Sequence, residues 1–525
     1  MGKMTREEVE ERLEEYAAYK SIKEAHEDEE ENPPEIDNDD VANEVADNSQ
    51  NSVEEKEDSE EEILVEDIPL EDGELQNEID HPPVPSLDNC DLSELDLSDL
   101  DFMGISIQNA NLTKTILNRA NLSNSYLMKS NFKNANLNDT NLSESDLSNS
   151  NLSQATLEDA NLEGSTLNGS NLSETIFERA NLRKCKLIET NLTKANLNEV
   201  TCGLADFSRS ELTDVKAIGS DFNRVKLSGA NLNNADFTDS RLSMAVFFET
   251  KFIGTNLNRA QIKGSKLVKA DFTDACLTRA DLTGADLSDA TLKGTNLLRA
   301  KLGGALLRRT HITNSNLKEV DLNIADLTSA KLEKVELDGA DLGRIKLKGA
   351  ALQGAQLTKA NISKGKLANI DLSGADLSGG NMRGTDFTEA KLTEVDLSRA
   401  DLTEAILENS ELKNSFLTGA DIRNANFKKA NLEGCDLSGA KITKAVFQHA
   451  NLKNSNLQRA DLEHADFSKA NLSQANLTGA KLADANFSNT ILTGADFSGA
   501  DTTDTNFSDA KGYKKQEWLS LRLEI

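Results

Sequence analysis

Proline and aromatic residues are scarce in this sequence of 525 residues. Only six prolines occur, none of them after Pro85, and aromatic residues make up 4% of the chain. Ordinary globular domains place prolines in their loops and bulky aromatic side chains in their cores. The last 440 residues contain no proline and few aromatic side chains. They are therefore not a string of such domains, and we expect a repetitive architecture instead.

Targeting signals are also lacking. The N-terminus, MGKMTREEVEERLEE, is acidic where a secretory signal has a basic end and an apolar run. No stretch approaches the ~18 continuous apolar residues of a membrane span. The five cysteines lie far apart without a C-x-x-C pair, which favours a reducing compartment over a zinc site or a disulfide framework. These features predict a cytoplasmic protein that does not contact a membrane.

Negative charge is concentrated at the N-terminus. Residues 1–90 carry 6 basic and 33 acidic side chains, which leaves a net charge of only −6 for residues 91–525. The total of −33 argues against direct binding to nucleic acid or to an anionic membrane. Residues 1–88 are expected to form an acidic, largely disordered tail.

One helical pattern occurs in this tail, over residues 5–30. Thr5 and Glu8 have the spacing of a capping box. Four apolar residues then share one helical face: Val9, Leu13, Tyr16 and Ala17. The surrounding glutamates favour a solvated helix over one that docks on the rest of the protein.

A leucine or phenylalanine recurs at every fifth position from Leu92 to Phe507. This spacing gives 84 centres in one unbroken phase, and all but three are large and apolar. The residue two places before each centre is almost always small, and Asn or Asp usually lies between them. Period five matches neither the 3.6 of a helix nor the 2.0 of a strand. It fits a short extended piece followed by a corner, so the chain should coil with each turn stacked on the last.

The Arg-Ala dipeptides indicate how many pentads form one coil. All seven begin at positions separated by multiples of twenty: Arg119, Arg179, Arg259, Arg279, Arg299, Arg399 and Arg459. Side chains on one face tend to recur at multiples of the coil length, so four pentads per coil are predicted. Duplication of 20-residue blocks predicts the same register. The centres then make about 21 coils, which at ~4.8 Å per layer form a rod of roughly 100 Å.

Pentads such as ANLTK (110–114), ANLSN (120–124) and ADLSG (375–379) resemble those of the pentapeptide-repeat proteins. The resemblance covers residues 89–510. It implies an all-β fold, a right-handed quadrilateral parallel β-helix with the centres and the small residues inside. Three bulky residues at small positions predict a distorted first coil: Leu95, Leu100 and Ile105.

Two segments outside the rod hold candidate contacts. The apolar residues within EEILVEDIPLED resemble a SUMO-interacting motif, which adds a strand to a partner's sheet, but folding back over the first coil is favoured: Ile63, Leu64, Val65 and Ile68. Residues 511–525 are expected to cap the last coil. The same residues could instead form a homodimer contact: Tyr513, Trp518 and Leu521.

No pattern supports catalysis, a metal site or a cofactor site. The five histidines lack metal-ligand spacing, and no nucleotide fingerprint or nucleophile elbow is present. The Asp residues of the pentads are displayed singly on a convex surface without an enclosed pocket. We therefore predict a protein that is not an enzyme.

The main surface candidate is a column of three arginines, Arg259, Arg279 and Arg299, which the register places on successive layers. Guanidinium groups ~5 Å apart repel one another unless acids interleave or a ligand neutralises them. Neighbouring acids favour a neutralised surface over a site for an anion or an acidic peptide: Asp271, Asp274, Asp281 and Asp286.

Three functions follow from these observations. Some pentapeptide-repeat proteins mimic DNA and engage type II topoisomerases such as gyrase. Residues 91–510, however, have a net charge of −8, whereas B-DNA of the same length carries about 60 negative charges. An end-to-end self-assembling structural element is the second alternative. The favoured hypothesis is a non-enzymatic scaffold or regulator that binds a protein partner through the faces of the rod.

Overall fold

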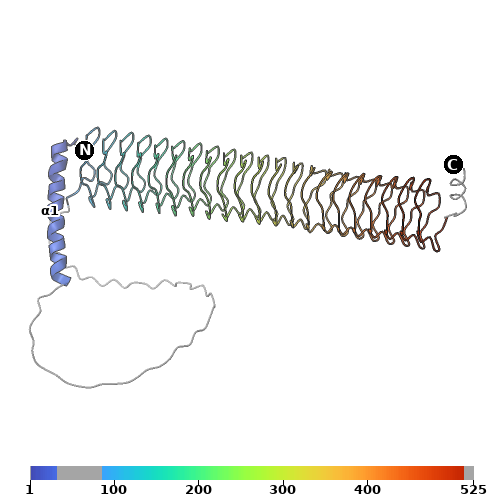
Figure 1. Cartoon of the computed structure of the whole chain (residues 1–525). Coiled ribbons are helices and arrows are strands. Elements are labelled where there is room, and N and C mark those ends of the chain that lie inside the picture. The colour runs from blue at the N-terminus through green and yellow to red at the C-terminus, as the bar shows by residue number, and fades with distance from the viewer. Residues whose placement is uncertain (1, 32–84, 513–525) are drawn as a thin grey trace, which may run out of the picture. The chain divides into compact units, whose positions relative to one another are not determined.

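A β-helix and one α-helix make up the computed structural model, which describes residues 2–31 and 85–512 (Figure 1). The chain divides into two compact units, Met1–Val9 with Leu87–Ile525, and Glu10–Ser86. The helix α1 (Arg6–Glu31) begins in the first unit and continues in the second. Within the described ranges, no helix is both long and apolar enough to cross a membrane.

Each coil of the β-helix takes twenty residues. From Asp91 to Lys511 every bridge is parallel and joins residues twenty apart, which is the spacing that four pentads per coil require. The amide of Leu112 donates to the carbonyl of Asn131 at 2.7 Å, and the amide of Asn131 donates to the carbonyl of Ala110 at 2.9 Å. Every pentad contributes one isolated bridge residue, and a two-residue turn closes nearly every pentad, the one from His311 to Ser315 being an exception. The backbone hydrogen bonds between coils therefore run along the axis of the rod.

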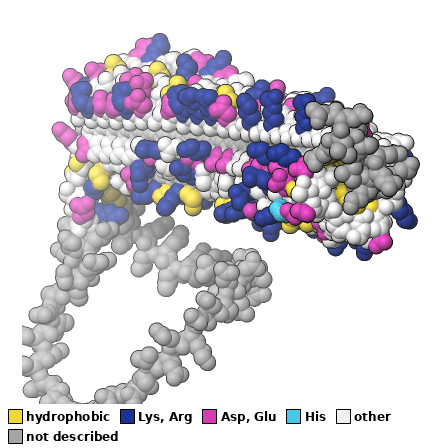
Figure 2. All heavy atoms as spheres, turned by 45° about the vertical axis from the view of Figure 1, so that its right-hand side comes forward, with side chains coloured by type: hydrophobic (Ala, Val, Ile, Leu, Met, Phe, Trp, Pro, Cys, Tyr) yellow, Lys and Arg dark blue, Asp and Glu magenta, His cyan; other side chains and the backbone are white. Residues whose placement is uncertain are grey.

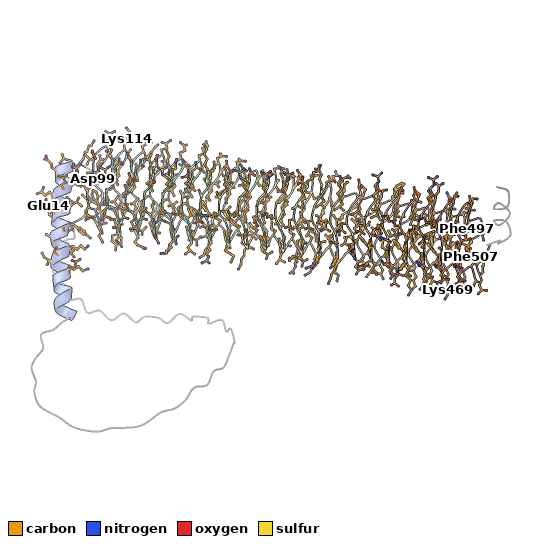
Figure 3. All side chains as sticks on the ribbon, viewed as in Figure 1. Glu14, Asp99, Lys114, Lys469, Phe497 and Phe507 are labelled. Carbon is orange, nitrogen blue, oxygen red and sulfur yellow. The ribbon has the colours of Figure 1, made fainter. Side chains whose placement is uncertain are left out.

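Two of the five positions in each pentad face the interior. The centre and the small residue two places before it point the same way because side chains alternate along an extended chain. Leu112 and Ala110 are accordingly 0% and 2% exposed. Near the C-terminal end, four consecutive coils stack phenylalanine rings with centroids 4.7 to 4.9 Å apart: Phe427, Phe447, Phe467 and Phe487. The core is a continuous apolar column that ends near Phe497 and Phe507 (Figure 3).

Nearly every pentad closes with a turn, and the second residue of these turns almost always has a positive φ angle. After Leu117, the amide of Ala120 donates to the Leu117 carbonyl at 3.0 Å, and Arg119 has a φ of 58°. Type II turns need this left-handed conformation at their third residue, and Gly and Asn adopt it with the least strain. Ile324, with a φ of 57°, is the single β-branched residue in this conformation among the described residues.

Replacing Ile324 by asparagine is expected to stabilise the protein by about 1 kcal/mol. The branched Cβ of Ile324 crowds the left-handed backbone, while 53% of the residue remains exposed and gains little from burial. Ile116→Asn is the matched control, because Ile116 is an exposed bridge residue where a β-branched side chain is favourable. Urea unfolding measures both variants. A lowered midpoint for Ile324→Asn would show that the turn is not strained.

The N-terminal residues cover the first coil. Lys3 forms a parallel bridge with Asp91, and the amide of Met4 donates to the Asp91 carbonyl at 3.0 Å. Val9, in the first turns of α1, is fully buried. The preference for a solvated helix is therefore wrong for this part of α1, because Val9 gains apolar burial within the β-helix unit.

The start of α1 has the capping box that the sequence predicts. The Thr5 amide donates to Glu8 Oε2 at 2.6 Å, and the Glu8 amide donates to Thr5 Oγ1 at 3.3 Å. Two amides that have no partner inside the helix are thereby satisfied. The capping box sets the residue at which α1 leaves the extended segment that pairs with the first coil.

The predicted distortion of the first coil is not present. The bridges of Asp91 with Asn111 and of Asp96 with Ile116 keep the twenty-residue spacing. Leu95 and Leu100 fit at small positions because they remain half-buried where the stack begins. Ile105, by contrast, is fully buried within the regular pattern.

Candidate interaction surface

Side-chain ladders cover much of the surface of the rod. Along one face, Nδ2 of Asn141 donates to Oδ1 of Asn121 at 3.1 Å, and Nδ2 of Asn161 donates to Oδ1 of Asn141 at 3.2 Å. The same oxygen of Asn141 also accepts from the amide of Ser143 at 3.3 Å. These amides satisfy one another and the following turn, which explains why Asn and Asp precede the centres. Such stretches leave few polar groups for a partner.

The arginines of the column pair with acids other than those that the sequence predicts. Arg259 donates from Nε to Oδ1 of Asp239 at 2.6 Å, and Arg299 donates from Nε to Oε2 of Glu319 at 2.7 Å. Both acids lie in the same column, one coil beyond each end of the triplet. Arg279, between the two, has no acidic partner among the residues that the structure describes. The column is thus neutralised at its ends and carries one free guanidinium at its centre.

None of the four acids expected to neutralise this column pairs with it in the described residues, and three of them are engaged elsewhere: Asp271, Asp281 and Asp286. Asp281 pairs with Lys263, whose Nζ lies 3.2 Å from Oδ2. Asp271 accepts the amide and the hydroxyl of Thr273 within its own turn. Acids at bridge positions, such as Asp271, are held by their own turns. The acids that pair with the arginine column, Asp239 and Glu319, instead occupy the same turn position as the arginines, two residues after a centre.

Acid is expected to weaken the β-helix through these arginine pairs. Hydrogen bonds from arginines one coil away lower the pKa below the ordinary 3.8 for four aspartates: Asp99, Asp159, Asp239 and Asp289. A carboxylate with a lowered folded-state pKa stabilises the protein above its unfolded pKa, and the contribution disappears as the pH falls through the folded value. The Tm should therefore be constant from pH 7 to about 5 and fall below about 4.

Variants of the arginines separate this effect from general acid unfolding. Replacing the four partners by glutamine should reduce the loss of Tm between pH 5 and pH 3: Arg119, Arg179, Arg259 and Arg309. Arg279→Gln is the control, because Arg279 has no acid to lose within the described residues. Differential scanning calorimetry records the profiles. An unchanged profile for the fourfold variant would remove these pairs from the explanation.

A second surface has free cations, and the sequence reasoning did not identify it. Two successive coils place five exposed cations on one face, and none of the five has an acidic partner within the described residues. We call this surface the Lys346 patch: Arg344, Lys346, Lys348, Lys364 and Lys366. No acidic residue occurs between Leu342 and Ile370, which was the available signal. On the rod in general, Lys and Arg gather in clusters with Asp and Glu between them (Figure 2).

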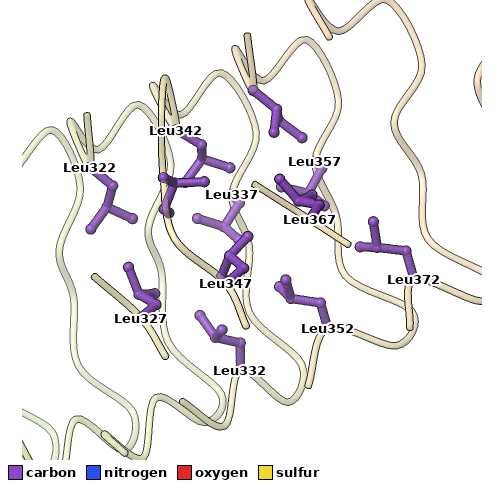
Figure 4. Close-up of a pocket in the computed structure, with 12 residues that line it drawn as sticks. Leu322, Leu327, Leu332, Leu337, Leu342, Leu347, Leu352, Leu357, Leu367 and Leu372 are labelled. Atoms are coloured by element: carbon purple, nitrogen blue, oxygen red, sulfur yellow. The ribbon is translucent and has the colours of Figure 1, made fainter. Parts of the chain in front are cut away.

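The interior of the described coils is apolar. A cavity of about 10 Å³ lies inside the coils and is lined by leucines and isoleucines, including Leu337, Leu347 and Ile345 (Figure 4). Burial raises the pKa of the Cys185 and Cys435 thiols to about 12, so both stay protonated. Within residues 2–31 and 85–512, no three His, Cys, Asp or Glu residues group closely enough to hold a metal ion. The exposed faces therefore remain the candidates for binding.

Two groups of candidate residues lie outside the described part of the chain. They are the apolar segment of the tail, Ile63, Leu64, Val65 and Ile68, and the C-terminal residues Tyr513, Trp518 and Leu521. Their proposed contacts stay predictions.

Family models match most of the rod. A model described as pentapeptide repeats matches in eight copies, over residues 175–214, 205–243, 245–284, 285–323, 325–363, 370–409 and 407–439. A second model, described as a pentapeptide repeat region, matches residues 95–172 and 440–512. Comparison with curated proteins gives no match.

Several solved structures are similar to this chain. HetL, a pentapeptide repeat protein involved in heterocyst differentiation regulation in Nostoc sp. strain PCC 7120, is 28% identical, with 50% of this chain and 89% of HetL covered and a TM-score of 0.24. Rfr23 from Cyanothece 51142 is 32% identical, with 21% and 58% covered and a TM-score of 0.12. QnrB1, a plasmid-mediated fluoroquinolone resistance protein, is 22% identical, with 43% and 97% covered and a TM-score of 0.27.

Proposed function

Because this chain belongs to the pentapeptide-repeat proteins, we propose that it is a non-enzymatic scaffold or regulator that binds a protein partner through the faces of its rod. The rod would comprise about 21 coils at ~4.8 Å per layer. The acidic tail of residues 1–88 would supply a second contact or a tether, and residues 511–525 would cap the last coil. The protein would act in the cytoplasm without contacting a membrane.

One observation carries the proposal. The twenty-residue register displays free cations at fixed positions on an exposed surface whose other polar groups largely satisfy one another. Arg279 and the Lys346 patch are held on coils joined by parallel bridges, so a partner would meet them with little loss of backbone entropy. A rigid array of this kind supports recognition of a surface, since the internal cavity of the described coils, about 10 Å³, is too small to hold a substrate.

Cross-linking of the full-length protein in extract of its own cells tests this function. We expect one protein partner at near-stoichiometric yield, with cross-links on lysines of residues 91–510. Sedimentation of the purified complex should give the mass of this chain plus the partner. Cross-links confined to residues 1–88 would assign binding to the tail instead. Recovery of no partner, or a mass that grows with concentration by self-association alone, would overturn the proposal.

A further inference from the structure

The Lys346 patch gathers five cations on two successive coils, whereas several cations on the neighbouring coils form ion pairs. On the neighbouring coils, Arg308 pairs with Asp326 at 2.9 Å, Lys318 with Glu336 at 2.9 Å and Arg383 with Glu404 at 2.8 Å. None of the five cations of the patch has such a contact within the part of the chain that the structure describes. Other cations nearby, such as Lys331, Lys359 and Lys391, also form no ion pair among the described residues, so the patch is distinguished by five unpaired cations gathered on two successive coils.

Acids at the border of the patch are already engaged. Asp326 is held by Arg308, and Asp386 accepts the amide and the hydroxyl of Thr388. Across the corners, Asp341 accepts from the side chain of Asn361 at 2.8 Å, and Asp371 accepts the amide and the hydroxyl of Ser373. Both oxygens of Asp326 are occupied, one by Arg308 and the other by Thr328, so Asp326 would have to give up a contact to neutralise the patch. The charge remains available to a ligand from outside.

The same two coils are held together less completely than the rest of the rod. Lys346 and Lys366 are bridge neighbours, so their ammonium groups extend from strands ~4.8 Å apart and repel each other. The bridges of Lys346 with Lys366 and of Ala351 with Asp371 are present. Among the described residues, however, the amides of Leu347, Leu352 and Asp371 do not form a hydrogen bond as well aligned as that of Leu357 to Asp376 at 2.8 Å.

Bulky residues at small positions occur at the same place. Ile345 and Ile370 are fully buried where most other pentads have Ala, Ser or Thr. The internal cavity, which Ile345 helps to line, lies in this region beneath the cations. A ligand with several negative charges would bridge the two coils, remove the repulsion and hold them closer.

We propose that the Lys346 patch binds an acidic polypeptide segment of a partner protein, an inference that rests on the proposed function and names the face it uses. The chemistry favours carboxylates on a flexible chain. An extended segment presents side chains of one face at every second residue, ~6.6 Å apart, which flexible lysines on two coils can follow. A long nucleic acid would extend beyond the patch over a rod of net negative charge and meet repulsion.

Fluorescence anisotropy with a fluorescein-labelled deca-glutamate peptide and the full-length protein tests the inference. At about 50 mM salt we expect saturable binding that weakens as salt is added. Lys346→Glu with Lys366→Glu should weaken binding about tenfold or more. The matched control is Lys216→Glu with Lys251→Glu, which changes the same net charge at exposed, unpaired bridge positions of other faces and should alter binding less than about twofold.

Hydrogen exchange supplies a readout that charge alone would not change. Bound peptide should slow exchange of the Leu347 and Leu352 amides in the wild type and leave it unchanged in the Lys346 and Lys366 variant. No peptide binding, or equal binding by patch and control variants, would overturn the inference. Tighter binding of a ten-residue oligothymidylate than of the peptide would overturn the choice of a polypeptide.

The two proposals fail in different ways. A protein that captures its partner in cells but not the peptide disproves the inference about the patch and leaves the scaffold function standing. Absence of any partner disproves the scaffold function whatever the peptide result. Circular dichroism of the double variants confirms that each is folded before these comparisons.

Discussion

Phe447→Ala is expected to destabilise the C-terminal coils by about 3–5 kcal/mol. The Phe447 ring is fully buried between Phe427 and Phe467, with centroid distances of 4.8 and 4.7 Å and nearly parallel planes. Its removal leaves a cavity at the middle of a stack, and neighbours in a hydrogen-bonded solenoid cannot collapse far enough to fill it. Urea unfolding and hydrogen exchange over residues 427–487 measure the loss.

Phe416→Ala is the matched control for this prediction. Phe416 occupies a bridge position and is 51% exposed, so the same substitution removes little buried surface and should cost less than about 1 kcal/mol. Because neighbouring coils interact mainly with each other, exchange should accelerate around Phe447 and remain slow in distant coils. Equal effects of the two substitutions would mean that the ring column does not hold this end together.

Val9→Asp is expected to open the N-terminal end of the rod. Val9 is fully buried, and the nearest arginines along α1 already have partners, Arg6 with Asp96 and Arg12 with the Ser86 carbonyl. An ionised carboxylate at this position would therefore lose hydration without full compensation, at a cost of at least about 2 kcal/mol. The bridge between Lys3 and Asp91 should then separate and expose the backbone of the first coil. An exposed edge of this kind pairs with other chains, so we expect concentration-dependent association in sedimentation velocity.

Ala18→Asp provides the comparison for the end of the rod. Ala18 lies in α1 and is exposed, so the same charge is introduced without burial. This variant should remain monomeric under conditions in which Val9→Asp associates. Association of both variants to the same extent would attribute the effect to charge on α1, and a monomeric Val9→Asp would show that the N-terminal residues do not protect the end.

The candidate surface shows where sequence reasoning stopped. The register of the Arg-Ala dipeptides placed Arg259, Arg279 and Arg299 in one column, yet the acids expected to neutralise them were wrong. Proximity in sequence favoured Asp281, which instead reaches Lys263 from a bridge position. The acids that do pair with the column are at the equivalent turn position one coil away. A comparison of whole columns at twenty-residue intervals would have identified them and the Lys346 patch.

The amino-acid sequence alone determined the repeat, the inward positions and the length of one coil. Each of these depends on a local pattern of five residues repeated in one phase, and a burial pattern of that kind has few structural solutions. Only the tertiary structure decided that Val9 is buried in the β-helix unit, that Arg279 lacks a partner among the described residues and that the coils around Lys346 are less completely bonded. These outcomes depend on which of several nearby side chains reaches a given charge, and on contacts between residues more than 80 positions apart. A pattern of period five contains no information about either.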